Sequence, residues 1–455
     1  MKKSLLAVAA IGAFASAAQA QSSVTVYGIL DVGYVGSNQS VTNTNPSSTA
    51  NYNMPATTSS NTGAQQYSNA TLKGTQSQFG QSAEQTSRIG FKGTEDLGGG
   101  TSAFFTAEFT LAPEQQYLSG STNGGLANRQ TFVGLKKSGL GDFAVGTQYL
   151  PIHIAVSKTD PGQQNNMTGS VIYTGQADSG VLGAYGGNQN AYTTRISNAL
   201  TLNSEVLAGF QGHAIAVLNN NNATSATNSS NAVVAGGATN TNGWGLGLDY
   251  TWNKLFVTAN YQSLKQLTSA CNNSNLTPVF STTCTGGTAS QVFNASAAAV
   301  ADTSVPSTKN NPINIQDNQS YVGATYDFGI LKAYASWISR KATDTANSGI
   351  YQKRQAEQIG VRSFITPTIE GWASAGVGTF TPMGMNQNSA HFNAWQLGSN
   401  YWLSKRTNLY AIYGQYAQAN ATYNQTVTSN GTVTLGGYNA NLNTNSYAIG
   451  VRHTF

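Results

Sequence analysis

The sequence predicts an all-β protein, a transmembrane antiparallel β-barrel of about 16 strands with short turns at one end and long loops at the other. Three observations predict it. Apolar and polar residues alternate over segments of about ten residues. The connections between these segments are either very short or very long. Charged residues make up only 9% of the chain, whereas soluble domains contain roughly 25%.

The first twenty residues have the features of a secretory signal. Two lysines precede an apolar run over residues 5–15, which is too short to span a bilayer, and an A-x-A cleavage sequence stands at 18–20. We expect residues 1–20 to be removed and residues 21–455 to form a single barrel domain. The remaining sequence has no apolar run of about 18 residues, so no transmembrane helix is predicted. An exported chain of this kind is either a soluble secreted protein or a barrel.

The alternation is clear in individual segments. In the segment from Thr101 to Leu111, one face carries Ala103, Phe105, Ala107 and Phe109. The other face carries Ser102, Phe104, Thr106 and Glu108. The same pattern along the chain predicts strands over residues 23–36, 86–96, 101–113, 127–137, 142–149, 191–200, 205–218, 242–252, 254–266, 318–328, 331–341, 354–365, 369–380, 392–403, 407–418 and 444–455.

The connections distinguish a barrel from a soluble sandwich. Short turns are predicted at 97–100, 138–141, 253 and 405–406. Long stretches rich in Asn, Thr, Ser and Gly are predicted to be loops at 36–84, 150–190, 219–240 and 267–316. Loops of that length argue against a compact soluble domain. Short periplasmic turns and long extracellular loops are typical of an outer-membrane barrel, and a barrel of this size encloses water unless a loop enters it.

Aromatic residues stand near several predicted strand ends, which fits two girdles at the membrane interfaces. These residues are Tyr34, Trp252, Trp337, Tyr401 and Tyr447. Their presence also agrees with the general enrichment of aromatic residues in strands.

The sequence contains few residues that could form a disulfide, a metal site or a catalytic site. Cys271 and Cys284 are predicted to form a disulfide, because an exported chain reaches an oxidising compartment. The four histidines are scattered and give no metal-ligand spacing. Catalytic and phosphate-binding motifs are absent, so neither an enzyme nor a cofactor is predicted. Removal of Lys2 and Lys3 with the signal lowers the formal net charge from +5 to +3, which is too small to indicate a nucleic-acid partner.

Four segments in order resemble the general porin family of Gram-negative bacteria, particularly the trimeric porins of β-proteobacteria. They are QSSVTVYGILDVGY at the start of the mature chain, SRIGFKGTEDLGGGTSAFFTAEFTL, NRQTFVGLKKSGLGDFAVGTQY and the ending SYAIGVRHTF. The ending is also similar to the barrel-assembly signature, with Tyr447 and Phe455 in its key positions and His453 as a departure.

The resemblance implies a homotrimer in the bacterial outer membrane, in contact with lipid and lipopolysaccharide and inserted by the barrel-assembly machinery. It implies a water-filled channel for passive diffusion of small hydrophilic solutes and ions. It also implies a third outer loop, about Leu150 to Asn190, that folds inward to narrow the pore.

The family lines its constriction with arginines that face acidic residues on the inward loop. Matching motifs assign the arginines to Arg88, Arg129 and Arg195. Alternation independently places Arg88 opposite Ile89 and Phe91, on the lumen face. Some relatives have a lysine where this chain has Ile29.

The loop lacks the acidic PEFGG motif of enteric relatives and offers Lys158 and Asp160. Asp31, Glu108 and Lys92 are expected to face the lumen, and the carboxylates of Asp31 and Glu108 would supply part of the missing negative charge. A fixed positive charge in a narrow channel with few opposing acids predicts a weak anion preference.

Two alternatives stay open at this point. One is a substrate-selective channel that binds a particular anion or small organic solute. The other is a barrel that acts mainly as an adhesin or phage receptor through its long outer loops. A barrel enzyme is the least favoured, because no set of histidine, acid and nucleophile stands on neighbouring strand ends.

Overall fold

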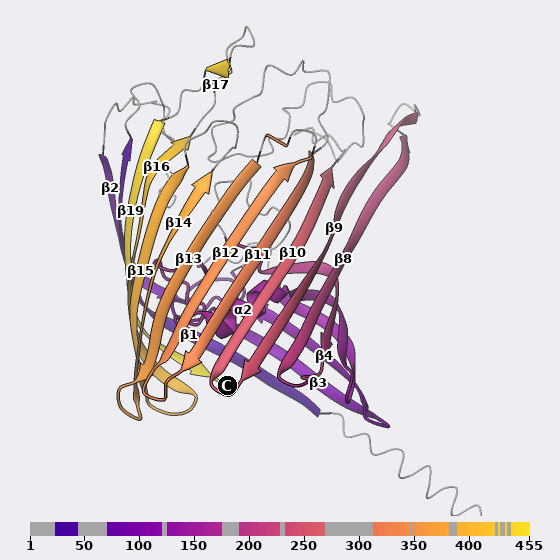
Figure 1. Ribbon diagram of the computed structural model, residues 1–455, viewed down its shortest axis with the longest axis horizontal. Helices are drawn as coiled ribbons and strands as arrows, with labels where there is room; N and C mark the ends of the chain where they lie inside the picture. The colour runs from indigo at the N-terminus through magenta and orange to yellow at the C-terminus, as the bar shows by residue number, and fades with distance from the viewer. Residues whose placement is uncertain are drawn as a thin grey trace, which may run out of the picture.

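The computed structural model describes residues 23–43, 71–120, 125–174, 191–227, 233–268, 313–345, 348–349, 351–381, 389–423, 426–427, 433–434 and 438–455. Over these ranges the chain forms a closed antiparallel β-barrel with an α-helix inside it (Figure 1). The expected signal at 1–20 and the expected disulfide between Cys271 and Cys284 lie outside the described residues. Within the described residues, no helix is long and apolar enough to cross a membrane.

The barrel wall consists of β1 (Ser23–Asn43), β2 (Thr71–Gln81), β3 (Arg88–Gly98), β4 (Thr101–Thr110), β5 (Asn128–Lys137), β6 (Gly141–Tyr149), β7 (Arg195–Ser204), β8 (Phe210–Thr227), β9 (Val233–Trp252), β10 (Leu255–Thr268), β11 (Ile313–Asp327), β12 (Lys332–Asp344), β13 (Tyr351–Phe364), β14 (Ile369–Thr381), β15 (Ala390–Trp402), β16 (Thr407–Tyr423) and β19 (Tyr438–Thr454). β17 (Thr426–Val427) and β18 (Val433–Thr434) form a separate short hairpin.

The 17 described strands of the main sheet occupy 16 positions around the barrel. The reason is that β2 and β3 pair with successive parts of β1, along the same edge of that strand. The other edge of β1 pairs with β19, which closes the barrel. The predicted antiparallel barrel of about 16 strands is confirmed.

Closure brings the first strand and the C-terminal residue together. Phe455 and Gly28 exchange two backbone hydrogen bonds, of 3.0 and 3.1 Å. A side chain at position 28 would not fit, because its Cβ would lie 2.3 Å from the Phe455 ring. Glycine at this position therefore allows the terminal aromatic ring to pack on the first strand.

The break between β2 and β3, at residues 82–87, is fixed by Asp31 on β1. The Asp31 Oδ2 atom accepts hydrogen bonds from the backbone N–H groups of Glu84 and Gln85, at 2.8 and 2.6 Å. Its Oδ1 atom accepts one from the hydroxyl of Tyr410, at 2.6 Å. Asp31 is on the inner side of the wall, as expected, but it is fully buried. Its carboxylate therefore holds the break in place and is not exposed to the lumen.

Short turns join the strands at the end of the barrel where the C-terminus lies (Figure 1). The turns predicted at 97–100, 138–141, 253 and 405–406 are all present. Three successive glycines, Gly98 to Gly100, have positive φ angles, which glycine adopts without steric cost. The predicted alternation of short and long connections is confirmed at this end.

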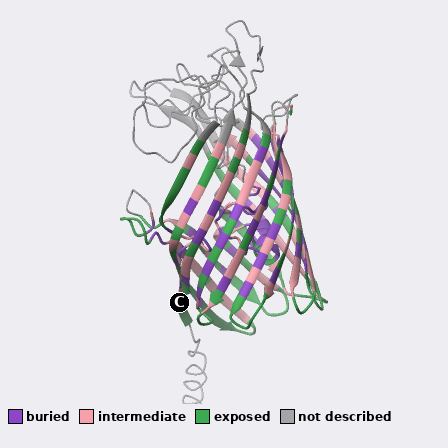
Figure 2. Ribbon diagram, turned by 90° about the vertical axis from the view of Figure 1, so that its left-hand side faces the viewer, coloured by how far each residue is buried: buried purple, intermediate pink, exposed green. Residues whose placement is uncertain are grey.

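The two faces of the wall differ in polarity in the sense expected for a membrane protein. Along β9 the outward residues Trp244, Leu246, Leu248 and Trp252 are 49–67% exposed, whereas inward Asp249 is buried. Figure 2 shows the resulting alternation of exposed and buried positions along the strands. Large apolar side chains thus face outward and polar ones inward, as in a barrel surrounded by lipid. Of the predicted aromatic residues, those exposed on the outside are Tyr34, Trp252, Trp337 and Tyr401.

Several strands extend past the segments that the sequence predicted. β1 extends into the predicted loop 36–84, and β8 and β9 extend into the predicted loop 219–240. The whole of β2 lies inside the predicted loop 36–84, so the prediction of a loop over residues 71–81 is wrong. In that extension Asn242 donates to Asn220 at 2.8 Å. Beyond the membrane both faces of a strand meet water, so hydrophobic alternation disappears although backbone pairing continues.

Two predicted boundaries are wrong for a different reason. β7 begins at Arg195 and not at 191, because residues 191–194 lie inside the barrel and are almost fully buried. β8 begins at Phe210 and not at 205, because residues 205–209 form a turn in which Gly209 has a φ of 87°.

The third outer loop folds into the barrel, as predicted. It begins with the helix α2 (Pro151–Thr159), which lies against the inner faces of β8 to β12. Proline occupies the first turn of this helix, where its missing N–H has no intrahelical partner to lose. Ile152, Ala155 and Val156 are buried against the wall. The described remainder of the loop, up to residue 174, follows the inner surface.

Candidate functional site

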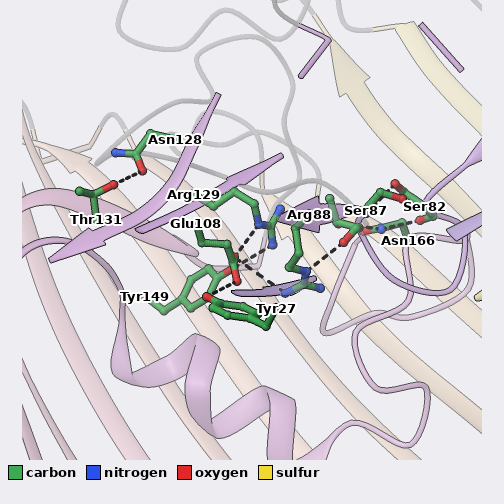
Figure 3. A network of polar contacts seen from close by, with 11 residues as sticks. Tyr27, Ser82, Ser87, Arg88, Glu108, Asn128, Arg129, Thr131, Tyr149 and Asn166 are labelled. Carbon is green, nitrogen blue, oxygen red and sulfur yellow. Dashed lines mark hydrogen bonds and ion pairs between the residues drawn. The ribbon is translucent and has the colours of Figure 1, made fainter. Parts of the chain in front are cut away.

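A cluster of charged side chains projects from neighbouring strands into the barrel. Glu108 on β4 lies between Arg88 on β3 and Arg129 on β5 (Figure 3). Its Oε1 atom is 2.8 Å from the Nε atom of Arg129 and 3.9 Å from the Nη1 atom of Arg88. Its Oε2 atom accepts a hydrogen bond from the hydroxyl of Tyr27 at 3.1 Å. One carboxylate therefore serves two guanidinium groups, and the cluster keeps a positive charge.

A register shift brings Arg129 into the barrel. Val133 and Leu135, which alternate with the inward residues of β5, are exposed on the outer face, and strict alternation would place Arg129 with them. The pairing of β4 with β5 shifts between Glu108 and Phe109. This shift inserts Arg129 as an extra residue and turns it inward, where it is 7% exposed. The family resemblance identified Arg129, whereas alternation alone would have excluded it.

Arg195 joins the cluster through Tyr149. Arg195 is the first residue of β7 and pairs with Tyr149 on β6, after a second register shift in that ladder. The Tyr149 hydroxyl accepts a hydrogen bond of 2.8 Å from the Nη2 atom of Arg129. Arg195 forms no ion pair with the carboxylates of the described residues, and its buried Nη1 atom has no hydrogen-bond partner among them. The three arginines of the sequence analysis thus lie in one region of the wall.

The helix of the inward loop presents His153 to this region. The ring centroids of His153 and Tyr149 are 4.3 Å apart. Burial, together with the positive charges of Arg129, Arg195 and Arg88, lowers the pKa of His153 to about 3. His153 is therefore neutral at physiological pH. The positive charges of all three arginines reach this one residue of α2.

Three buried glutamines on the opposite wall hold the inward loop by its backbone. Gln319 accepts a hydrogen bond from the N–H of Thr193 at 2.8 Å. Gln358 accepts one from the N–H of Val171 at 3.0 Å. Gln396 donates to the carbonyl of Met167 at 2.7 Å. These contacts position the loop with neutral groups.

The two charged loop residues of the sequence analysis lie apart from the arginine cluster. Lys158 forms an ion pair of 2.7 Å with Asp249 on β9. Asp160 is 3% exposed and accepts hydrogen bonds from the side chain of Gln358 and the backbone N–H of Gln164, at 3.0 and 2.7 Å. Burial raises the pKa of Asp160 in spite of these bonds. Asp160 therefore anchors the loop to the wall and presents no free carboxylate to the arginines.

The other expected residues have distinct places. Lys92 is exposed, and its Nζ atom lies 5.4 Å from the centre of the Tyr27 ring. Tyr447 on β19 packs against Tyr34, with ring centroids 6.2 Å apart. Phe455 packs on β1 as described above. The role of Tyr447 and Phe455 in barrel assembly stays a prediction.

Four further inward arginines were not singled out from the sequence. They are Arg340, Arg354, Arg362 and Arg452, and each is 8% exposed or less. Alternation could have found Arg354 and Arg362, since the exposed residues Ile359 and Val361 occupy the opposite parity on the same strand. Within the described ranges, no group of three or more His, Cys, Asp or Glu residues could hold a metal ion.

Comparisons of the sequence with known proteins all point to porins. A family model described as Gram-negative porin matches residues 7–421. An outer membrane porin protein of Bordetella pertussis is 27% identical over 451 residues, which covers 92% of this chain and 94% of that protein. Outer membrane porin protein 32 of Delftia acidovorans is 31% identical over 151 residues, which is 33% of each chain.

The fold is similar to those of solved outer-membrane proteins. An anion-selective porin from Comamonas acidovorans superimposes with a TM-score of 0.58 at 18% sequence identity, covering 96% of this chain and all of that chain (100%). A trimer form of OmpT from Vibrio cholerae superimposes with a TM-score of 0.53 at 12% identity, covering 95% of this chain and 99% of that one.

Proposed function

The chain belongs to the Gram-negative porin family, and on that premise we propose that it is a homotrimeric diffusion channel with a weak preference for anions. It is a multi-pass protein of the bacterial outer membrane and forms a channel. Small hydrophilic solutes and ions would pass through its water-filled interior without chemistry or a cofactor.

The proposed selectivity rests on the excess of positive over negative charge in the arginine cluster. Arg88 and Arg129 share the carboxylate of Glu108, and Arg195 has no ion-pair partner among the described residues. Three cations and one anion leave an excess of positive charge. Low-dielectric walls focus the field of such a charge along the pore and raise the local concentration of anions.

The inward loop does not offset this charge in its described part. His153 is neutral, because burial and the arginines lower its pKa to about 3. Asp160 is enclosed by hydrogen bonds at the far wall, and Lys158 is paired with Asp249. The excess positive charge of the cluster therefore meets no free carboxylate on this segment, which supports anion preference over cation preference.

A reversal potential in a salt gradient across a planar bilayer tests the selectivity. The wild-type channel should favour anions weakly, and Arg88→Ala should reduce that preference. Lys353→Ala is the matched control, because Lys353 lies opposite Lys341 at the outward positions of β12 and β13. A clear cation preference in the wild type, or an unchanged reversal potential in Arg88→Ala, would contradict the proposal.

The proposed homotrimer is supported by an open strand edge. β2 pairs with β1 along one edge. The ladder of β4 stops at Thr110, opposite Arg88, so the described residues provide no ladder for the other edge of β2. Phe79 on β2 is 86% exposed. An unpaired edge with an exposed aromatic side chain is a ready contact for another chain, and a second copy is the proposed occupant.

Chemical cross-linking in native outer membranes tests the assembly. Cysteine in place of Phe79 on β2, an exposed position, should give a disulfide-linked dimer under oxidising conditions, because one introduced cysteine per chain joins two chains. Cysteine at Leu248, which faces outward from β9, is the control and should not. Equal cross-linking from both positions, or none from either, would remove the support for this contact.

A further inference from the structure

Two pairs of like charges face each other across β12 and β13. The register places Arg340 opposite Arg354 and Lys341 opposite Lys353. Alternation directs the arginine pair into the barrel, where the two residues are 8% and 3% exposed. Like charges that stand directly opposite in a sheet are destabilising unless a negative charge compensates them.

Asp317 compensates one of the two arginines. The Nη2 atom of Arg340 is 2.7 Å from Asp317 Oδ2, and its Nε atom is 3.2 Å from Oδ1. Asp317 is fully buried. This two-point contact uses the fork geometry of the guanidinium group and satisfies the charge of Arg340.

Among the described residues, no carboxylate forms an ion pair with Arg354. Its Nη2 atom donates to the carbonyl of Val171 on the inward loop at 2.7 Å, and its guanidinium carbon is 4.6 Å from the centre of the Phe392 ring. Its buried Nε and Nη1 atoms have no hydrogen-bond partner within the described part of the chain.

The surroundings of Arg354 are apolar. Its register partner on β14 is Phe380. Phe380, Phe392 and Ile338 belong to one buried apolar cluster, together with Val171 of the inward loop. A guanidinium ion enclosed in this way is costly unless an opposite charge accompanies it. A water molecule would satisfy its N–H groups but would not neutralise its charge.

We propose that a small monovalent anion, chloride under ordinary conditions, binds to the Nε and Nη1 edge of Arg354 beneath the inward loop. The same guanidinium group holds the Val171 carbonyl, so the anion and the loop share one anchor. The bound anion would fix the loop against β13. The inference does not depend on the ion preference of the channel, because it concerns a buried charge and not a permeating ion.

Bromide replaces chloride and can be located by its anomalous scattering. Crystals of the wild-type protein soaked in sodium bromide should show an anomalous peak within hydrogen-bonding distance of Arg354 Nε and Nη1. The peak should vanish in Arg354→Met and remain in Lys353→Met, which removes the neighbouring charge from the outer face. Bromide only at exposed cations, or a water molecule without anomalous signal at Arg354, would overturn the proposal.

Unfolding temperature provides a second readout. An anion that binds only the folded state raises that temperature. The wild type and Lys353→Met should unfold at a higher temperature in sodium chloride than in sodium gluconate of equal ionic strength. Arg354→Met should lose this difference, and Arg354→Lys, which keeps the charge but not the two donors, should show a smaller one. An equal chloride effect in Arg354→Met and the wild type would refute the site.

Discussion

The Nε atom of Arg129 lies 2.8 Å from the Oε1 atom of Glu108, and Arg88 shares the same oxygen at 3.9 Å. The carboxylate thus neutralises one of two adjacent cations in the barrel interior. Its removal exposes the full charge of both arginines to passing ions. Glu108 is therefore as informative about selectivity as the arginines themselves.

We expect Glu108→Gln to increase the preference for anions. A unit charge about 6 Å from an ion in water contributes about 0.7 kcal/mol. Its removal should raise the anion permeability and lower the cation permeability about threefold each, so the ratio of the two should rise about tenfold. The reversal potential in a potassium chloride gradient measures this ratio. Glu95→Gln is the control, because Glu95 is an exposed residue near a short turn. A fall in anion preference on Glu108→Gln would contradict the expected role of the cluster.

We expect Asp31→Asn to destabilise the barrel where its first and last strands meet. The neutral side chain loses the charge-assisted hydrogen bonds to the backbone of Glu84 and Gln85. A hydrogen bond to a charged group contributes roughly 1.5–3 kcal/mol and one to a neutral group about 0.5–1.5 kcal/mol, so replacing two charged bonds by neutral ones should cost about 2–3 kcal/mol. Urea unfolding in lipid vesicles measures it. Asp96→Asn, at an exposed turn, should change stability much less, and equal losses in both variants would argue against the anchor role of Asp31.

We expect deletion of residues 158–170 to enlarge the single-channel conductance. This segment lies on the inner wall, where Asn165 donates to Gln396 at 3.0 Å. Its removal frees cross-section for water and ions. Replacement of the same residues by a Gly–Ser segment of equal length is the control for loop bulk, and should raise conductance less. An unchanged conductance after deletion would mean that this segment does not narrow the pore.

We expect His153 to make the folded protein less stable in acid. Its pKa is about 3 in the folded chain, against about 6.5 when unfolded. Between these values the unfolded chain binds a proton that the folded chain does not. Stability from this group is therefore complete above pH 6.5 and falls towards pH 3, by at most about 1.4 kcal/mol per pH unit.

Urea midpoints between pH 7 and pH 4 measure this loss. His153→Gln should flatten the decline, because glutamine does not titrate. His391→Gln is the control, since His391 is exposed on the outer face of β15, and it should keep the wild-type slope. If His153→Gln declines as steeply as the wild type, the low pKa of His153 is not the cause.

The fold was predictable from the sequence wherever one side of a strand faces lipid. The alternation of Leu246 and Leu248 with Asp249 marks β9 through the membrane. The same strand continues to Val233. It passes through residues 239–242, where threonine and asparagine alternate, so the apolar alternation is lost there. The helix α2 was also missed, although a proline at its first position was a usable signal.

The site was only partly predictable, because two of its arginines depend on irregular pairing. Arg88 follows the alternation of its own strand. Arg129 faces inward because of a register shift opposite Glu108 and Phe109, and such a shift leaves no mark in single-sequence periodicity. The third arginine, Arg195, also follows a register shift. The burial of Asp160 was likewise unpredictable, because it depends on a contact with Gln358, which is 198 residues away in the sequence.

The contacts of the inward loop with the last strand have a consequence for the order of assembly. The N–H of Thr168 donates to the side chain of Ser446 on β19 at 3.0 Å, and Asn166 donates to the carbonyl of Ser82 beside β1 at 2.6 Å. These two docking points are neighbours only after β19 has paired with β1. The loop therefore reaches its native position only late in assembly, and a barrel still open along that seam lacks the two contacts that hold the loop in place.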